Sequence, residues 1–509
     1  MSNIGTWMQN VGAAWLMALL SPSPLLVALV QTATSLPVFL LGIPAGAIAD
    51  IVDRRKLLIW TQTWMLAAAG ILGVMTVAGY ISPWWLLLLT FALGVGSTMN
   101  GPAWYAIMPE LVPRTELPAA IALNSASFNL ARAVGPALGG AVVAATGAGP
   151  AFLLNALSFV GVVAVLWLWR AHPRELPQAE ERIASAMLAG IRYVRFAPPM
   201  HSVLIRSAAF VTPGSALWAM LPLLAKTELH RGSSGYGVLL GCLGAGSILS
   251  ATVISRMRER FGPDTLASVA TALFGVVSVS LFWLGHFGFI CLVLVLGGMS
   301  WMMVNANLNI ATQTNTPTWV RARALGMYLL AFQSAFAVGS ALAGMFAEHF
   351  GIRYTLLGAG VCLFVSATAT VRLRLGSAEP TEVSPAPLLS EPTMAMDIPP
   401  EHGPVLVAVE YQIDLARRNE FIRVMRGMKM IRRRDGAMRW GLYEDVAAPG
   451  RMRESFVVEN WAEHLRQHER MTAADREVQR HARSFHIGEG APEVKHWVAA
   501  EPFEETPRD

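Results

Sequence analysis

One arginine of this sequence stands where a charge is costly. Arg132 lies inside a long apolar stretch, about 21 Å along a helix from Pro118 at 1.5 Å per residue. An arginine at mid-membrane depth costs at least about 2.5 kcal/mol unless it faces water or a partner. We predict that Arg132 faces a water-filled path, where its guanidinium would hold an anionic or acceptor-rich molecule. The alternative is a structural arginine, bonded to backbone carbonyls or to Asn129.

Other polar side chains in the apolar stretches are candidates to line the same path. Three of them repeat every fourth residue between 305 and 313, which puts them on one face of a helix. Hydrogen bonds between helices explain such groups equally well. The set expected to line the path with Arg132 is Gln31, Ser125, Asn129, Asn305, Asn309, Gln313 and Gln333. No Asp or Glu lies deep in an apolar stretch, so the residues name no proton carrier.

A second polar cluster follows an apolar helix between residues 42 and 56. Gly42, Gly46 and Asp50 fall on one helical face, so a stripe of small residues ends in a carboxylate. The residues that follow are Asp53, Arg54 and Arg55. A carboxylate here can accept hydrogen bonds from a helix N-terminus or pair with an arginine, and would latch this end of the molecule shut. A plain topological anchor is the alternative.

The helices that must position these groups are predicted by the composition. The 509 residues are 54% hydrophobic and 14% charged, which is typical of a membrane protein with a soluble part. Before Gly376, 21 Lys and Arg stand against 11 Asp and Glu, while the rest of the chain has 18 against 23. With about 20 apolar residues needed for each span, we expect twelve spans before Gly376. The first span is short and lacks a basic lead, so either the natural start lies upstream or this helix is truncated.

The charges of the connections predict the orientation. Sixteen Lys and Arg residues fall on one set of connections and three, Lys226, Arg231 and Arg353, on the other. By the positive-inside rule the first set is cytoplasmic, and twelve spans then place both termini in the cytoplasm.

The helical part contains the same pattern twice, at an offset of 204 residues. The stretch from Phe128 to Gly147 returns as Phe332 to Gly351, but Phe336 stands in place of Arg132. Two six-helix halves with a site between them are a transporter architecture. In the first copy Pro136 removes a backbone hydrogen bond and bends the helix, and small residues let a neighbour approach. The residues predicted to form this bend are Gly135, Pro136, Gly139 and Gly140.

After Arg374 the composition changes to a Pro-rich tether and then to a compact pattern of strands and helices. Their order is βαββαβ, the ferredoxin-like plan of an α+β domain. We expect five parts: a six-helix half at 1–170, a cytoplasmic loop at 171–199, a second six-helix half at 200–376, a linker at 377–403 and a cytoplasmic domain at 404–509.

Three features that suggest other chemistry are better explained by structure. His464 and His468 share a helix face, but no third ligand is fixed, so no metal site is predicted. The cysteines at 242, 291 and 362 lie in apolar runs and are read as small hydrophobic residues. The basic run at 432–434 lies in a net-negative domain, which favours a solvated helix end or lipid contact over nucleic acid.

The stretch GAIADIVDRRK at 46–56 resembles the loop signature of the major facilitator superfamily, with Ile51 and Asp53 departing from it. Pro136 with its glycines resembles the fifth-helix signature of exporters in that superfamily. The strings at 109–140 and 459–470 look like the transmembrane secretion effector branch, which includes enterobactin exporters. The resemblance implies the twelve-helix major facilitator fold, proton antiport without a bound cofactor, and a monooxygenase-like tail domain that forms homodimers.

We therefore expect a secondary exporter of siderophore-like or drug-like small molecules in the bacterial inner membrane, and not an enzyme. Its expected partners are the lipid bilayer and a small-molecule substrate, with no nucleic acid. The alternative is a membrane-anchored enzyme or sensor in which the tail domain carries the activity. No Walker-type nucleotide loop is present in the sequence, which disfavours ATP-driven pumping.

Overall fold

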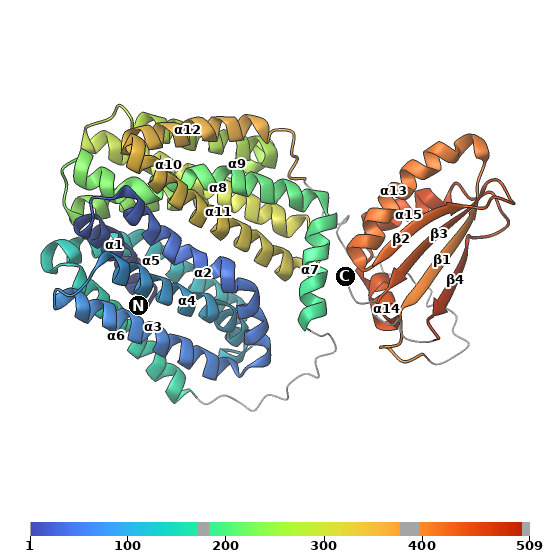
Figure 1. Cartoon of the computed structure of the whole chain (residues 1–509), viewed down its shortest axis with the longest axis horizontal. Coiled ribbons are helices and arrows are strands. Elements are labelled where there is room, and N and C mark those ends of the chain that lie inside the picture. The colour runs from blue at the N-terminus through green and yellow to red at the C-terminus, as the bar shows by residue number, and fades with distance from the viewer. Residues whose placement is uncertain (1, 114, 170–182, 377–397, 501–509) are drawn as a thin grey trace. The chain divides into compact units, whose positions relative to one another are not determined.

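The structure is a computed structural model that describes residues 2–113, 115–169, 183–376 and 398–500 (Figure 1). The chain divides into two compact units. The first comprises Met1–Gln178, Val203–Asn309 and Tyr328–Arg374, and the second comprises Ala179–Ser202, Ile310–Met327 and Leu375–Asp509. Most of the predicted linker and part of the predicted cytoplasmic loop lie outside the described residues.

The first half of the helical part is built from six helices. They are α1 (Ser2–Leu20), α2 (Pro24–Ile51), α3 (Arg54–Val77), α4 (Pro83–Leu111), α5 (Leu117–Thr146) and α6 (Ala148–Leu168). Local chemistry sets several starts: the side chains of Ser23, Asp53 and Ser82 cap α2, α3 and α4, and proline is the first residue of α2 and α4.

The second half follows the amphipathic helix α7 (Ile183–Phe196). Its elements are α8 (Pro198–Leu223), the π-helix η1 (Leu224–Glu228), α9 (Ser233–Ser280), α10 (Phe287–Thr314), α11 (Arg321–Phe350) and α12 (Ile352–Ala369). α9 contains two of the predicted spans. The backbone of Gly262, with φ 72°, interrupts the helical geometry between them.

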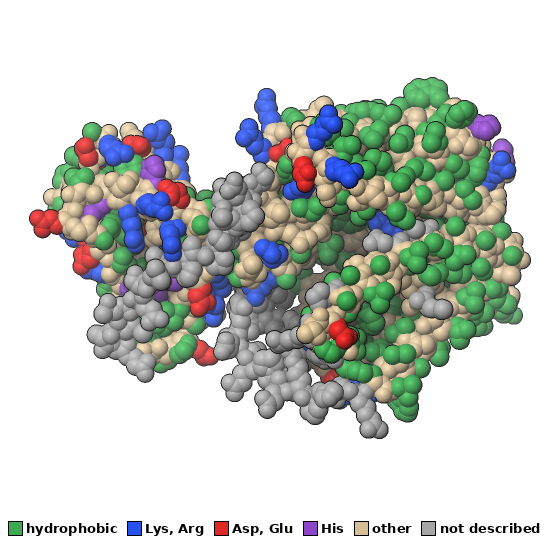
Figure 2. Space-filling view, turned by 180° about the vertical axis from the view of Figure 1, so that it is seen from behind, with side chains coloured by type: hydrophobic (Ala, Val, Ile, Leu, Met, Phe, Trp, Pro, Cys, Tyr) green, Lys and Arg blue, Asp and Glu red, His purple; other side chains and the backbone are tan. Residues whose placement is uncertain are grey.

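Ten helices of the described residues are long and apolar enough to cross a membrane. The prediction of twelve spans differs in two places: α9 is one element, and α1 is not among the ten. The α1 sequence carries Asn3, Thr6, Gln9 and Asn10, which lower its hydropathy. Figure 2 shows hydrophobic side chains covering much of the helical surface, with Lys and Arg mostly toward its ends. The predicted fold class, a helical membrane protein with a small α+β domain, is confirmed.

The internal repeat is visible in the packing of the helices. A Cβ built on Gly135 of α5 would lie 2.6 Å from Trp7 Cβ of α1, and one on Gly339 of α11 would lie against the Thr212 carbonyl of α8. Equivalent glycines therefore hold equivalent helices together in each half. The turns agree as well, since α6 begins after Gly147 and α12 after Gly351, with φ 86° and 84°.

The tail domain is a four-stranded antiparallel sheet in the order β2-β3-β1-β4. Its strands are β1 (Val405–Gln412), β2 (Arg439–Glu444), β3 (Arg451–Val458) and β4 (Glu493–Val498). Its helices are the 3-10 turn η2 (Leu415–Arg417), α13 (Arg418–Asp435), α14 (Trp461–Arg470) and α15 (Ala473–Arg483). Alternate residues of β1, such as Val409 and Tyr411, join a core with Phe421 and Met425 of α13 and Phe485 after α15. This is the predicted βαββαβ order.

Candidate functional site

The face of α5 that carries Arg132 also carries a contact between the two halves. Pro136 and Gly140 follow Arg132 at intervals of four residues, so the three share one helical face. A Cβ on Gly140 would lie 2.7 Å from Gly237 Cα and 2.8 Å from the Ser233 carbonyl of α9. Arg132 therefore stands about two helical turns, roughly 12 Å, from Gly140, where α5 and α9 touch.

The Arg132 side chain is half-buried and forms no ion pair or hydrogen bond within the part of the chain that the structure describes. A cation removed from water without a partner is unfavourable, and an arginine so placed in a membrane marks a functional pathway or a water-filled space. Ser125, two turns earlier, is exposed and has a polar partner. The side chain of Asn129, also predicted here, lies outside the described residues.

Contacts between the halves gather at one end of the helices. Trp15 of α1 stacks with Tyr236 of α9 at 6.1 Å between ring centroids. The hydroxyl of Ser23, at the start of α2, donates to Glu348 of α11 at 3.0 Å. The Lys226 ammonium of η1 donates to the Ala18 carbonyl of α1. Aromatic stacking and hydrogen bonds thus close this end of the molecule.

The spacing between α2 and α11 widens along the two helices. A Cβ on Gly344 would lie 2.6 Å from Ala28 Cβ, and the Thr32 hydroxyl donates to the Ala337 carbonyl at 2.9 Å. Further along α2, a Cβ on Gly42 would meet Leu330 at an ordinary 3.7 Å, and one on Gly46 would meet no described atom within 4 Å. The two helices are therefore packed more closely where α2 begins than at Gly42.

The remaining predicted pathway residues fall on different helices. Gln333 shares the face of α11 that carries Leu330 and Ala337, so it lies on the side toward α2. Gln31 on α2 is half-buried. The structure brings these two glutamines to neighbouring helices of opposite halves.

The stripe of amides on α10 is partly used within its own half. The Asn305 amide donates to the Trp301 carbonyl at 2.7 Å, while its Oδ1 is buried with no hydrogen bond among the described residues. Asn309 is half-buried and Gln313 is exposed, and both have polar partners. Gln313 belongs to the second compact unit.

The sequence did not lead us to predict an aromatic face on α11. Tyr328, Phe332 and Phe336 repeat every fourth residue, and the two phenylalanine rings stack at 6.3 Å. Trp301 of α10 meets both phenylalanines edge-on at 6.1 Å. The 204-residue offset contained the signal, because Phe336 is the equivalent of Arg132.

The basic cluster at the start of α3 binds helices of its own half. Arg54 donates to the Ala106 carbonyl of α4 at 3.0 Å, and Arg55 donates to the Leu166 carbonyl of α6 at 2.8 Å. Asp53 accepts from the Lys56 amide at 3.0 Å as the cap of α3. The side chain of Asp50 lies outside the described residues, so the predicted carboxylate latch stays a prediction.

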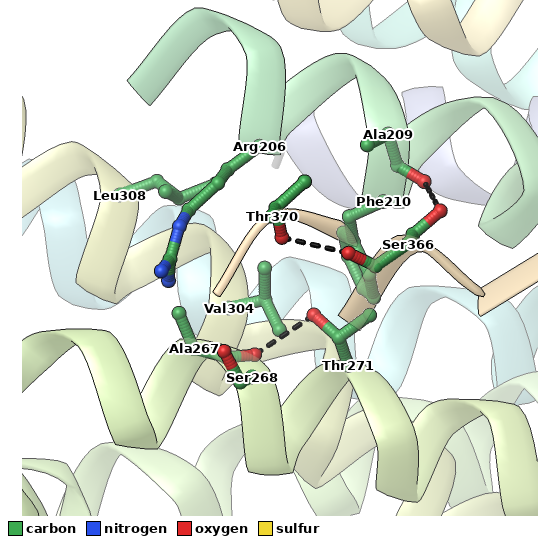
Figure 3. Close-up of a pocket in the computed structure, with 10 residues that line it drawn as sticks. All are labelled: Arg206, Ala209, Phe210, Ala267, Ser268, Thr271, Val304, Leu308, Ser366 and Thr370. Atoms are coloured by element: carbon green, nitrogen blue, oxygen red, sulfur yellow. Dashed lines mark hydrogen bonds between the residues drawn. The ribbon is translucent and has the colours of Figure 1, made fainter. Parts of the chain in front are cut away.

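The second half has a polar cluster at the corresponding place. Arg258, the repeat equivalent of Arg54, donates to Asn307 Oδ1 of α10 at 2.6 Å, and Asn307 donates to the Pro263 carbonyl at 2.7 Å. The buried Arg206 of α8 pairs with Asp264 at 3.2 Å. The same arginine and side chains of α9, α10 and α12 line a small pocket (Figure 3) of about 10 Å³. That volume suits one water molecule rather than a substrate.

The tail domain holds three histidines close together. The ring of His464 lies 4.8 Å from those of His468 and His496 between centroids. Burial lowers the pKa of His464 to about 3 and that of His468 to about 4, so both are neutral at pH 7. Among the described residues, no group of three His, Cys, Asp or Glu side chains is arranged to hold a metal ion.

Two arginines of the basic run are paired inside the same domain. Arg432 donates to the fully buried Glu454 at 3.2 Å, and Arg434 donates to Asp475 at 2.6 Å. Their charges are therefore balanced by carboxylates of the domain itself.

A pocket of about 430 Å³ lies over the other side of the sheet. It is lined by Glu410, Tyr443, Glu444, Asp445, Arg451, Arg453 and Ser455. Arg451 and Arg453 both donate to Glu410 at 2.6 Å, and these hydrogen bonds, which outweigh burial, lower the pKa of this carboxyl group.

Comparisons with known proteins agree with this architecture. The chain is 24% identical over 362 residues to the staphyloferrin A transporter of Staphylococcus aureus. The alignment covers 70% of this chain and 90% of that relative. It is 22% identical over 378 residues to the multidrug efflux pump Tap of Mycolicibacterium fortuitum. That alignment covers 72% of this chain and 92% of the pump.

The fold is shared with solved transporters at low sequence identity. A bacterial homologue of the human lysosomal transporter Spinster, in an inward-facing and occupied conformation, matches with a TM-score of 0.59 and 15% identity over 72% of this chain and 93% of its own. The nucleoside transporter NupG matches with a TM-score of 0.55 and 13% identity over 73% of this chain and 98% of its own.

The family model described as transmembrane secretion effector matches residues 1–503, so the match includes the tail domain. Two packed helical halves, the repeat that relates them and this match lead to one conclusion: the chain belongs to the transmembrane secretion effector family of major facilitator transporters.

Proposed function

We propose that this transporter exports small molecules across the bacterial cell membrane by alternating access. The observation that carries the proposal is the half-buried Arg132, which has no polar partner among the described residues and lies about two turns from the α5–α9 contact at Gly140. The named relatives that transport a siderophore or drugs support export of molecules of similar size.

The proposed mechanism uses the two ends of the helices in turn. With the end at the start of α2 closed, a substrate enters from the opposite end and its acceptor groups contact Arg132. Binding energy that favours the other arrangement then opens the closed end, because a ligand shifts a two-state equilibrium by its difference in affinity for the two states. The glycine contacts at Gly140 and Gly344 are the surfaces that separate.

The polar residues divide into proposed roles. Arg132 binds the anionic or acceptor-rich part of the substrate, and the amides on α2, α10 and α11 supply further hydrogen bonds. The expected set remains Gln31, Ser125, Asn129, Asn305, Asn309, Gln313 and Gln333. The cluster of Gly46, Asp50, Asp53, Arg54 and Arg55 acts as the gate latch. Export driven by protons stays a proposal without a named carrier.

We propose the orientation from the charge asymmetry of the connections. The sixteen basic residues on one set of connections against three on the other put both termini and the tail domain in the cytoplasm. The open end of the halves then faces the cytoplasm, where an exporter loads its substrate. We propose that the five predicted parts of the chain are its domain organisation. We also expect the tail domain to form homodimers.

The direct test is substrate accumulation in cells. Cells with and without the protein are loaded with siderophores, drugs and dyes, and the retained amount is measured over time. A reduced retention that depends on Arg132 is expected, so Arg132→Gln should abolish export at an unchanged membrane level. Arg195→Gln, an exposed arginine on α7, is the matched control and should export normally. Normal export by Arg132→Gln would refute the assigned role.

A second candidate function is favoured by the 430 Å³ pocket in the tail. A membrane-anchored enzyme or sensor would use this pocket, where Glu410 and the two arginines supply charged groups. Purified full-length protein is incubated with candidate aromatic substrates, and product is followed by mass spectrometry. Turnover that is lost in Glu410→Gln while export persists would establish this second activity, and no turnover would leave transport as the single function.

A further inference from the structure

The second compact unit joins segments that are far apart in sequence. It contains α7, which lies in the stretch between the two halves, the loop between α10 and α11, and the tail domain. Tyr193 of α7 meets Trp319 of the loop at 6.0 Å between ring centroids and 88° between planes, and its hydroxyl donates to the Asn315 carbonyl at 3.1 Å. α7 is therefore packed on the α10–α11 loop through an aromatic pair.

The tail domain covers this aromatic pair with two arginines. The guanidinium of Arg470, at the end of α14, lies 4.6 Å from the Trp319 ring centroid. The guanidinium of Arg434, on α13, lies 5.9 Å from the Tyr193 ring centroid. Both distances are within the range of cation–π attraction, which strengthens when water is excluded.

An ion pair ties the tail to α7 as well. Arg192 Nη2 lies 2.9 Å from Glu463 Oε1, and Arg470 Nη1 lies 2.6 Å from the same oxygen. Burial alone would raise the pKa of Glu463, but the guanidinium groups of Arg470, Arg466 and Arg192 hold the pKa of this carboxyl below its usual range. Glu463 is thus ionised at cytoplasmic pH.

These contacts are buried, which separates them from ordinary surface ion pairs. Tyr193, Glu463 and Arg470 are 3%, 4% and 5% exposed. Exposed ion pairs contribute little because water and salt screen them, whereas a buried charge that loses its partner is strongly destabilising. The junction therefore favours contact between the tail and α7 over separation.

We propose that Arg434, Glu463 and Arg470 form a docking surface for the transporter's own connection between halves, and that docking slows the change of access. The surface holds Arg192 and Tyr193 of α7 together with Trp319 of the α10–α11 loop. Alternating access moves one half against the other. Any motion that separates α7 from this loop must break the buried junction. The regulatory part of the proposal rests on the proposed transport function, while the docking itself does not.

Docking is tested by cutting the chain between the two parts. A protease site is inserted in the 377–397 stretch of the full-length protein, the purified protein is cleaved in detergent, and the tail fragment that remains bound is quantified by size exclusion. The variant Arg192→Ala with Trp319→Ala removes two of the three contacts, the ion pair to Glu463 and the cation–π contact to Arg470, from outside the tail, so the tail's own fold is untouched. Arg195→Ala, exposed on the same helix, is the control.

The expected result is that the cleaved tail co-elutes with the helical part in the wild type and in Arg195→Ala, and that at least tenfold less co-elutes in the double variant. Separation of the wild-type tail after cleavage, or equal retention in the double variant, would overturn the docking surface.

The regulatory part is tested with the uncleaved proteins in the export assay. Release of the restraint predicts at least a twofold faster initial export by the double variant than by the wild type at equal membrane level. An unchanged or slower rate, with the tail released, would overturn the restraint. An absence of export by the wild type with all tested compounds would refute the proposed function instead, because the retention measurement would still report docking.

Discussion

Replacement of Gly140 by alanine should shift the protein toward the state that opens at the start of α2. The new Cβ would lie 2.7 Å from Gly237 Cα and 2.8 Å from the Ser233 carbonyl, whereas ordinary carbon contacts are about 3.5–4.0 Å. The helices α5 and α9 must therefore separate by about 1 Å. Overpacking of this kind costs typically about 1–3 kcal/mol, and it acts only while this end is closed.

The size of the shift follows from that cost. A change of about 1–3 kcal/mol in a two-state equilibrium corresponds to roughly 5- to 150-fold. Gly237→Ala is the milder variant, because its Cβ would lie 2.9 Å from Gly140 Cα and 3.0 Å from the Pro136 carbonyl. Gly161→Ala is the control, since a Cβ there would meet no described atom within 4 Å.

A disulfide cross-link at the same end reports the closed state. Ser23→Cys and Glu348→Cys are introduced into a chain whose own cysteines are replaced, because the Ser23 hydroxyl and the Glu348 carboxylate are 3.0 Å apart across the halves. The cross-linking rate should fall at least fivefold with Gly140→Ala, less with Gly237→Ala, and not at all with Gly161→Ala. Equal rates in all three backgrounds would refute the role of this contact.

Three further predictions follow from the same structure. Gly344→Ala, the repeat equivalent, should slow the same cross-link, because its Cβ would press on α2. Arg258→Ala should lower stability by about 1–2 kcal/mol through loss of its bond to Asn307, as read by thermal unfolding, while the exposed Arg256→Ala should not. The folded pKa of His464, about 3, lies below its ordinary value of 6.5, so its contribution to stability is complete above pH 6.5 and is lost as pH falls toward 3. The protection factors of the amides in the tail strands, which are corrected for the intrinsic exchange rate at each pH, should therefore fall on acidification, and His464→Phe should reduce that fall.

The fold was largely predictable because its signals are local or repeated. Apolar length predicted the helices, alternation predicted β1, and the offset of 204 residues predicted two equivalent halves. Gly135 and Gly339 show why the repeat is reliable, since both fill the same packing role against α1 and α8. The same regularity could not separate contacts within a half from contacts between halves, because Gly139 packs on α1 while its neighbour Gly140 packs on α9.

The site was less predictable because it depends on pairing across long distances in sequence. The pair of Arg206 with Asp264 joins α8 to the kink of α9, and no spacing rule relates the two positions. The pair of Glu463 with Arg192 joins positions 271 residues apart, and it likewise could not be predicted from the sequence. Arg132 was found from sequence because its cost depends on depth along one helix, which the sequence contains.

The most direct test of the account is the reactivity of a cysteine at position 132 toward a membrane-impermeant maleimide. Arg132→Cys is placed in the cysteine-free chain, and Val134→Cys, on the opposite side of α5, is the matched control. The account predicts that position 132 is labelled from the cytoplasmic side, that a transported substrate slows the labelling, and that position 134 stays unlabelled in the membrane. If position 132 is no more reactive than position 134 with and without substrate, no aqueous path passes Arg132 and the proposed pathway is wrong.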